Sequence, residues 1–225
     1  MDRILEPELM NDPEQVQAYS HADFGEAHQS IIENFAKIFP TIFSESGQSV
    51  NVLDLGCGSG DVTVRFAQRY TECHIDAIDG AAEMLKQAEK LISMHALSQR
   101  ITLHLQQLPN CTIEKKMYQT IFSNSLLHHL YEPQHLWSTI KQYASADTAI
   151  YICDLFRPNS VQQAQQIVDQ YANKEPEILR TDFFNSLLAA FTPNEVRNQL
   201  SIAEIKGLNI DIVSDRHMLI YGFIE

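Results

Sequence analysis

The stretch that decides the fold is Val52-Leu53-Asp54-Leu55-Gly56-Cys57-Gly58-Ser59-Gly60-Asp61. It predicts a buried strand that ends in an acid, a turn with glycines at alternate positions, and the start of a helix. Glycine has no Cβ, so alternate glycines leave one edge of the turn as bare backbone against which a ligand can lie. A helix start also presents free N–H groups and the positive end of its dipole. We therefore expect a small nucleotide-like molecule at this turn.

The spacing of the glycines separates two kinds of nucleotide site. A dinucleotide fingerprint is Gly-x-Gly-x-x-Gly, whereas Gly60 comes one residue too early for that pattern. Asp54 stands two residues before Gly56, and a carboxylate there suits a positively charged ligand better than a pyrophosphate. S-adenosylmethionine, with its sulfonium and ammonium groups, fits this description. A tight turn without a ligand is the alternative, because a glycine loop alone is a weak signal.

A second signal follows downstream. The segment 74–79 predicts a short strand, followed by Gly80 and a helix over 81–91. An acid at the carboxyl end of the second strand of such a unit can accept hydrogen bonds from ribose hydroxyls, and Asp79 is in that place. Asp79 could instead cap the following helix, since Asp is favoured at helix N-caps.

Together these motifs resemble the class I S-adenosylmethionine-dependent methyltransferases of the small-molecule type over residues 50–154. The resemblance implies a Rossmann-like fold, S-adenosyl-L-methionine as cofactor, and methyl transfer to a small molecule by in-line displacement. It also implies that Asp79 holds both ribose hydroxyls and that Met84 packs near the adenine, although Met84 equally suits plain core packing. The other expected cofactor contacts are Asp54, Gly56, Cys57, Gly58, Gly60, Gly80, Gln106, Gln107 and Asn124.

One part of the family pattern is missing. Relatives often place an acid before a Leu-Pro pair, where it contacts the adenine amino group, but this chain has His104, Gln106 and Gln107 before Leu108-Pro109. A glutamine carbonyl can accept the same hydrogen bond. We therefore assign Gln106 and Gln107 to the adenine.

Strands and helices alternate through most of the chain, which predicts an α/β, doubly wound, mostly parallel seven-stranded sheet. Only the residues 214–217 join the last two strands, so the final strand should be antiparallel to its neighbours. The predicted strands are 50–55, 74–78, 101–105, 120–123, 149–154, 210–213 and 218–223.

The length of 225 residues suggests a single domain. We divide it into an N-terminal helical cap (1–48), a cofactor-binding core (49–156), a helical lid (157–207) and a terminal hairpin (208–225). The lid exceeds what one crossover needs, so we expect it, with the cap, to cover the carboxyl ends of the strands. Aromatic residues of cap and lid are expected to surround the substrate, although core packing is the alternative for each: Tyr19, His21, Phe24, Phe156, Tyr171, Phe183, Phe184 and Phe191.

Polar residues at the ends of the fourth and fifth strands suggest where the chemistry occurs. His128 or His129 could act as general base, since an unperturbed histidine titrates near neutrality. Adjacent helical residues diverge by about 100°, so we expect only one of the two to line the pocket. Arg157 could bind a substrate carboxylate, or could pair with Asp154 or with an acid of the lid.

Composition limits the partners. The chain has 29 acidic and 16 basic residues and a net charge of −13, which disfavours nucleic acid. No apolar run approaches the roughly 20 residues that cross a bilayer, and the start lacks the features of a signal peptide. The four cysteines show no metal-type spacing. We expect a cytoplasmic protein with a small-molecule substrate and no metal, no nucleic-acid or membrane partner, and a homodimer as a possible assembly.

Two other functions remain open at this point. The lid could exclude any acceptor, so that the cofactor's own amine or carboxylate attacks and methylthioadenosine is released by cyclisation or lyase chemistry. The chain could also bind the cofactor without catalysis, as a scaffold or partner subunit.

Overall fold

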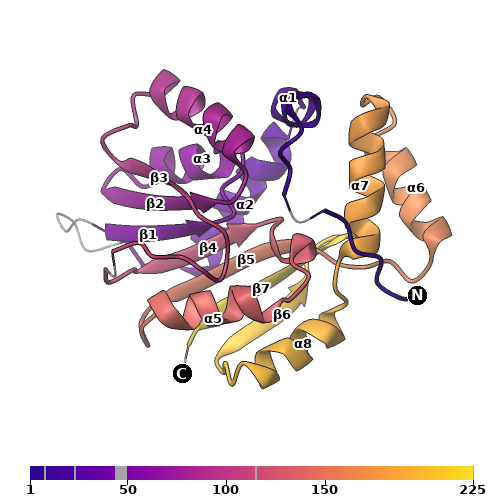
Figure 1. Cartoon of the computed structure of the whole chain (residues 1–225). Coiled ribbons are helices and arrows are strands. Elements are labelled where there is room, and N and C mark those ends of the chain that lie inside the picture. Colours follow the sequence, from indigo (N-terminus) through magenta and orange to yellow (C-terminus); the bar gives the residue numbers. More distant parts are fainter. Residues whose placement is uncertain (8, 23, 44–49, 115, 225) are drawn as a thin grey trace.

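A seven-stranded sheet forms the centre of the molecule in the computed structural model, which describes residues 1–7, 9–22, 24–43, 50–114 and 116–224 (Figure 1). The strand order is β3-β2-β1-β4-β5-β7-β6. The strands are β1 (Val50–Leu55), β2 (Cys73–Asp79), β3 (Ile101–Leu105), β4 (Thr120–Asn124), β5 (Ala149–Leu155), β6 (Leu208–Ile212) and β7 (His217–Phe223).

The topology confirms the doubly wound prediction. Strands β1 to β5 are parallel, and the order reverses between β1 and β4, which are paired. The final strand β7 is antiparallel to both β5 and β6, as the short link before it requires. A reversal of strand order opens a crevice at the carboxyl ends of the strands, where ligands of such sheets bind.

Helices complete the alternation. The described helices are α1 (Pro13–His21), α2 (Gly25–Ile38), α3 (Asp61–Arg69), α4 (Ala82–Met94), the 3-10 helix η1 (Leu127–His129), α5 (Gln134–Tyr143), α6 (Val161–Tyr171), α7 (Glu177–Ala189) and α8 (Pro193–Ile202).

Each face of the sheet has its own core, because successive strand residues point to opposite faces. Val52 packs with residues of α2, α3 and α4 on one face. Leu53 packs with α5 and α8 on the other, around the buried Trp137. Helices α2 and α8 therefore belong to the core layers.

The remaining helices lie beyond the carboxyl ends of the strands (Figure 1). Helices α6 and α7 pack on each other around their own apolar cluster, and α1 contacts both α4 and α7. Of the predicted lid over 157–207, helices α6 and α7 thus lie at the carboxyl ends of the strands. The expected boundary between residues 48 and 49 lies outside the described residues.

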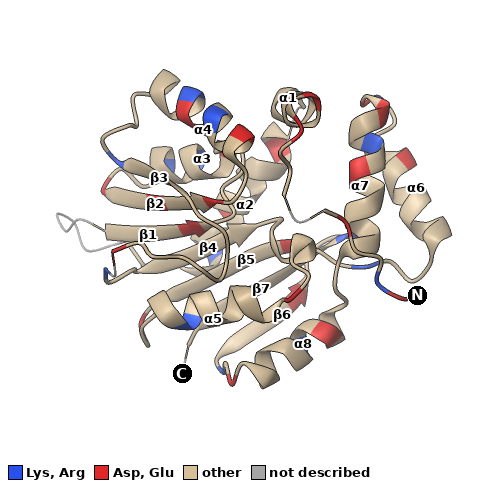
Figure 2. Cartoon of the chain, viewed as in Figure 1, with Lys and Arg blue, Asp and Glu red and all other residues tan. Residues whose placement is uncertain are grey.

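The distribution of charge distinguishes the same edge. Acids lie at the carboxyl ends of β1 and β2, where Asp54 and Asp79 are found (Figure 2).

All four cysteines are buried free thiols. Within the described ranges, no helix combines the length and the apolar character that crossing a membrane requires.

Candidate active site

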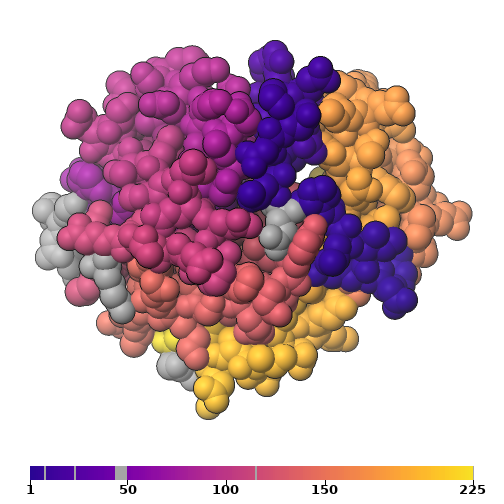
Figure 3. Space-filling model, viewed as in Figure 1, coloured from indigo at the N-terminus to yellow at the C-terminus, as the bar shows by residue number. Residues whose placement is uncertain are grey.

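A cavity of about 900 Å³ opens at the carboxyl ends of the strands. It runs from the glycine turn and the start of α4 to η1, α7 and the start of β7. In Figure 3 the N-terminal residues, in indigo, lie between the purple and magenta core and the orange helices. The volume is at the upper end of the range of ligand pockets, about 300–1,000 Å³, which leaves room for a cofactor and a second molecule.

The glycine turn forms one wall of this cavity. Gly56 and Gly58 line it with φ values of +76° and +52°, a left-handed conformation that glycine adopts without strain. A Cβ added to Gly58 would meet no described heavy atom within 4 Å, so its backbone faces open space. The structure thus provides the bare rim that the sequence predicts at Gly58.

Asp79 orders this rim. Its Oδ2 accepts a hydrogen bond of 2.8 Å from the Gly58 N–H, and its Oδ1 accepts one of 2.7 Å from the Ala81 N–H at the start of α4. Burial raises the pKa of Asp79 above its ordinary value. Because each carboxylate oxygen has two acceptor positions, the same group can still accept hydrogen bonds from a ligand in the cavity. Asp79 is not the N-cap of α4, which is Ala81, so the capping alternative does not hold; its two backbone hydrogen bonds order the turn and are compatible with ribose binding.

Gly60 has a different role from the one we expected. The described residues that line the cavity do not include it. At φ +85° it is the N-cap of α3, and a Cβ there would lie 3.0 Å from the Cβ of Ala88 in α4. The third glycine of the turn thus allows α3 and α4 to approach each other closely, and it does not contact the cavity.

Asp54 lies at the base of the cavity and is 2% exposed. Its Oδ2 accepts a hydrogen bond of 2.5 Å from the Thr63 hydroxyl. Burial raises the pKa of Asp54 to about 7. A ligand with positive charge would favour the ionised carboxylate.

In the part of the cavity where the sequence predicts the adenine, only some of the hydrogen-bonding groups are available to a ligand. Gly80, Met84, Gln106 and Gln107 all line the cavity, but the Gln106 carbonyl already accepts a hydrogen bond of 2.7 Å from the Thr112 N–H. That hydrogen bond closes the loop after β3. The side-chain carbonyl of Gln106 is therefore used by the protein in this structure.

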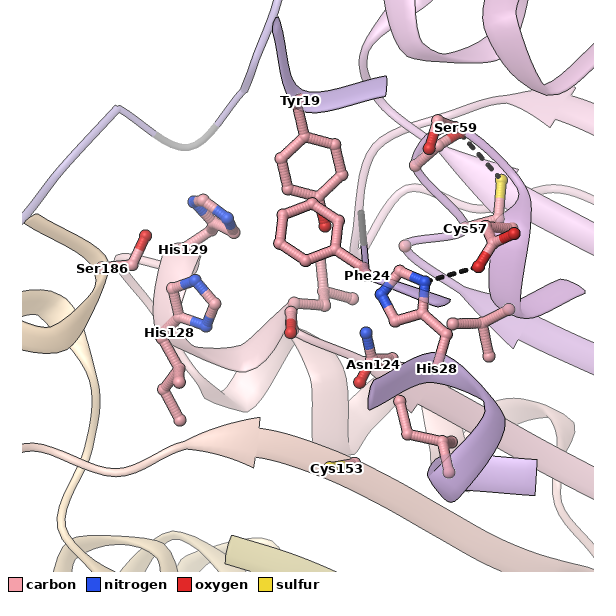
Figure 4. Close-up of a pocket in the computed structure, with 18 of the residues that line it drawn as sticks. Tyr19, Phe24, His28, Cys57, Ser59, Asn124, His128, His129, Cys153 and Ser186 are labelled. Atoms are coloured by element: carbon pink, nitrogen blue, oxygen red, sulfur yellow. Dashed lines mark hydrogen bonds and ion pairs between the residues drawn. The ribbon is translucent and has the colours of Figure 1, made fainter. Parts of the chain in front are cut away.

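Two aromatic residues of the cap, Tyr19 and Phe24, lie between the histidines of η1 and the glycine turn in the view of Figure 4. The rings of Tyr19 and Phe24 are 5.0 Å apart, and the Phe24 ring is 5.4 Å from His28. His28 Nδ1 lies 2.6 Å from Asp61 Oδ2, at the start of α3. Burial opposes the charge of Asp61, but hydrogen bonds from His28 and Arg65 lower its pKa to about 2.

Sequence reasoning missed His28. It lies on the buried face of α2, where Ile32 and Phe35 follow at spacings of four and seven residues. A histidine on the apolar face of a helix that packs beside the glycine turn was the available signal.

Both His128 and His129 line the cavity, which corrects the expectation that only one would (Figure 4). Their ring centroids are 4.2 Å apart at an interplanar angle of 35°. The 100° rule fails because η1 is a single 3-10 turn, and the chain leaves it at Leu130 in an extended conformation.

Asp154 orients His128. Its Oδ1 lies 2.7 Å from His128 Nδ1, and its Oδ2 accepts a hydrogen bond of 2.8 Å from the Leu127 N–H. Burial disfavours the charged imidazole, but the negative charge and hydrogen bond of Asp154 outweigh it and raise the pKa of His128. Asp154 was expected as a possible partner of Arg157, and this partnership with His128 was not foreseen.

Glu6 meets both histidines. Its Oε1 lies 3.7 Å from His128 Nε2 and 3.2 Å from His129 Nδ1, and its Oε2 accepts a hydrogen bond from Ser186 of α7. Burial raises the pKa of Glu6 to about 7 and moves the pKa of His129 well below its ordinary value. Glu6 is far from η1 in sequence, so no motif could have indicated it.

Two predicted substrate residues point elsewhere. The guanidinium of Arg157 binds the Ala190 carbonyl at 2.9 Å and Glu195 Oε1 at 2.6 Å, and the side chain is 6% exposed. Phe156 forms a bridge with Phe191 and packs on the core beneath α8. Neither residue is among the described residues that line the cavity. Arg157 therefore pairs with an acid of the predicted lid, Glu195, which was the alternative to binding a substrate carboxylate.

The other predicted aromatics divide in the same way. Tyr171 and Phe183 of the lid helices line the cavity, in addition to Tyr19 and Phe24. Three other predicted residues are absent from the described lining of the cavity: His21, Phe184 and Phe191.

Part of the chain is similar to proteins of a known family. Residues 52–147 match the family model of a methyltransferase domain. A malonyl-[acyl-carrier protein] O-methyltransferase from Bacillus cereus is 25% identical over 130 residues, which are 58% of this chain and 46% of that protein. A probable (S)-tetrahydroprotoberberine N-methyltransferase 2 from Papaver bracteatum is 43% identical over 51 residues, 21% of this chain and 14% of that protein. The chain spans less than half the length of the curated relatives it matches.

Solved structures show the same fold at low identity. A SAM-dependent methyltransferase from Aquifex aeolicus superposes with a TM-score of 0.70 at 18% identity, covering 96% of this chain and all of that one. The plantazolicin methyltransferase BpumL in complex with SAH gives a TM-score of 0.70 at 17% identity, covering 95% and 91%. Over residues 52–147 the chain therefore matches a methyltransferase domain, and its fold is the one found in S-adenosylmethionine-dependent methyltransferases.

Proposed function

We propose that this protein transfers the methyl group of S-adenosyl-L-methionine to a small-molecule acceptor. The observation that carries the proposal is the shared cavity, which has the bare backbone of Gly58 and the Asp79 carboxylate at one end and paired histidines at the other. Both halves of a transfer reaction therefore have a place beside one another.

The cofactor is assigned to the glycine end. Asp79 holds the ribose hydroxyls, and the adenine lies near Gly80, Met84 and the two glutamines. Asp54 and Asn124 face the methionine part of the cofactor, where the positive charges lie. Three features support this orientation: the bare rim beside Asp79, the buried carboxylate of Asp54, and the lining of the cavity.

The acceptor is assigned to the end formed by the histidines, with the rings of Tyr19 and Phe24 between it and the cofactor. Transfer from a sulfonium requires mainly that acceptor, methyl and sulfur are aligned and that water is excluded. His128 is the candidate general base for an acceptor that must lose a proton, since Asp154 holds its Nδ1 and leaves Nε2 for the reaction. His129 stays a second candidate beside it.

The setting of the enzyme is part of the proposal. We expect it to act in the cytoplasm on a free small molecule, which the four free thiols support. A homodimer remains a prediction, to be tested by sedimentation.

Calorimetry with S-adenosylmethionine and S-adenosylhomocysteine tests the cofactor assignment. Asp79→Ala should weaken the binding of both by about 10–100-fold, because charge-assisted hydrogen bonds contribute about 1.5–3 kcal/mol. Glu72→Ala, an exposed acid just before β2, is the matched control and should bind like the parent protein. Absence of binding to the parent protein, or equal affinity of Asp79→Ala, would reject the assignment.

Incubation with the cofactor alone tests the reaction. A methyltransferase should consume little S-adenosylmethionine without an acceptor and should form S-adenosylhomocysteine when amine, phenol or carboxylate acceptors are supplied. Release of methylthioadenosine without any acceptor would contradict methyl transfer and support the intramolecular alternative.

A further inference from the structure

Three potential metal ligands from distant parts of the sequence meet at one side of the cavity. They are Glu6, His128 and His129, and one potential ligand atom from each lies within 4.8 Å of the others. Glu6 comes from the N-terminal segment, and both histidines come from η1. Figure 4 shows the two imidazoles side by side, across the cavity from the glycine turn.

The polar atoms at this point are left unsatisfied. The side chain of Glu6 is only 9% exposed, yet its Oε1 has no hydrogen-bond partner in the described part of the chain. His129 Nδ1 is buried and equally without a partner there, although it lies 3.2 Å from that oxygen. Buried polar atoms normally have partners, so an unsatisfied carboxylate oxygen facing two ring nitrogens calls for an additional group.

The distances suit a small cation. Two ligand atoms that bind one ion at about 2.1 Å stand roughly 3.0–3.5 Å apart. Glu6 Oε1 is 3.2 Å from His129 Nδ1 and 3.7 Å from His128 Nε2, so a small inward movement would bring the set to binding distance.

The groups behind the ligands are also of the kind found around metals. A ligating histidine usually donates its other N–H to a carboxylate, and His128 Nδ1 lies 2.7 Å from Asp154 Oδ1. A ligating carboxylate is usually hydrogen-bonded in turn, and Ser186 donates to Glu6 Oε2 at 3.2 Å. Arg3 fixes the segment that carries Glu6 by donating to the carbonyls of His128 and Leu130.

We propose that Glu6, His128 and His129 bind one divalent first-row transition-metal ion. Two imidazoles and one carboxylate suit such ions, whereas Mg²⁺ and Ca²⁺ prefer oxygen ligands. His128 and His129 line the cavity, so the coordination positions that the chain leaves open face it. A metal there would bind an oxygen atom of the acceptor and lower its pKa, a role that rests on the proposed methyl transfer. The ion would then take the place of His128 as the group that activates the acceptor.

Metal titration of the full-length, chelator-treated protein tests the site. Zn²⁺ is followed by calorimetry and Co²⁺ by its visible ligand-field absorption, and each should bind with one equivalent. Glu6→Gln and His129→Gln should each weaken binding by at least about ten-fold, and Asp154→Asn should weaken it by about 10–100-fold. His28→Gln is the matched control, because His28 also lines the cavity beside a carboxylate but lies away from Glu6.

The outcomes separate this inference from the proposed function. S-adenosylhomocysteine affinity reports on the glycine end and should persist in Glu6→Gln and His129→Gln, which also verifies that these variants are folded. Absence of saturable Zn²⁺ and Co²⁺ binding, or binding that His28→Gln reduces as much as Glu6→Gln does, would overturn the metal site while leaving cofactor binding intact. Shifts of the imidazole ¹⁵N signals of His128 and His129 on adding Zn²⁺ would support it directly.

Discussion

At the scale of single residues, two buried carboxylates prepare the cavity in different ways. Asp79 is held by backbone N–H groups on both of its oxygens, so its orientation is fixed before a ligand arrives. Asp54 has one hydroxyl donor and a pKa that burial raises to about 7. Asp79 therefore acts mainly through geometry, whereas Asp54 should act through its charge.

The charge of Asp54 predicts a pH dependence of cofactor binding. Its pKa is raised from 3.8 to about 7, so the free protein is most stable below pH 3.8 with respect to this group and loses that contribution as pH rises through about 7. A cationic ligand favours the ionised form. The affinity for S-adenosylmethionine should therefore increase by up to about ten-fold in total between about pH 6 and about pH 8, and should level off once Asp54 is ionised.

The matched ligand provides the control for this prediction. S-adenosylhomocysteine lacks the sulfonium charge, so its affinity should change less with pH over the same range. Asp54→Asn should remove the difference between the two ligands, as measured by calorimetry at several pH values. Parallel pH profiles for both ligands in the parent protein would show that Asp54 does not sense the sulfonium.

At the scale of elements, the glycine turn assigns separate tasks to residues of one type. Gly58 keeps the rim bare, whereas Gly60 allows α3 to pack against Ala88 of α4. In both, a left-handed backbone makes alanine unfavourable, by about 1–2 kcal/mol. Only Gly60 adds a close contact, of 3.0 Å to the Ala88 Cβ.

Alanine substitutions should therefore separate binding from stability. Gly58→Ala should lose about 1–2 kcal/mol of unfolding free energy and most of its affinity for S-adenosylhomocysteine, because its Cβ occupies the rim. Gly60→Ala should lose about 1–3 kcal/mol more stability through overpacking, with affinity largely kept in the folded fraction. Urea unfolding and calorimetry measure the two quantities, and equal effects of both variants on affinity would contradict the division.

The elements also show what sequence could predict. The strands were predictable because burial on two faces gives short apolar runs, and the four-residue link fixed the direction of β7. The position of Asp54, Gly58 and Asp79 at the cavity was predictable because all three follow directly from the strand–turn–helix pattern of neighbouring residues. The site was not predictable where distant segments meet, and Glu6 on His129 is the clearest example.

Local rules failed at η1 and after β5 for physical reasons. The rule of 100° per residue applies to a regular α-helix, and a single 3-10 turn followed by extended backbone does not obey it. Arg157 lies two residues after β5, near the cavity in sequence. Its guanidinium instead forms an ion pair of 2.6 Å with Glu195 of α8. Local backbone geometry decides where the histidines of η1 point, and a tertiary contact decides where Arg157 points.

At the scale of the whole molecule, the N-terminal segment joins the core to the lid. Arg3 donates to the carbonyls of His128 and Leu130 in the core and of Ala189 at the end of α7. Its guanidinium also lies 3.8 Å from the centre of the Phe191 ring. One side chain thus connects the two walls of the acceptor end.

Arg3→Ala should consequently loosen the whole assembly without removing the cofactor site. Arg3 is partly exposed, so the loss of its hydrogen bonds should cost about 1–2 kcal/mol, which corresponds to a decrease in Tm of about 2–8 °C for a chain of this size. Arg197→Ala is the matched control, because Arg197 is exposed on α8 and donates a hydrogen bond to the nearby Asn194 within the same helix; its Tm should change by less than about 2 °C. Affinity for S-adenosylhomocysteine should stay within about two-fold in both variants, since neither arginine lines the cavity. If Arg3→Ala keeps the parent Tm, or loses cofactor affinity in proportion to its stability, the segment does not join the two walls in the way these contacts indicate.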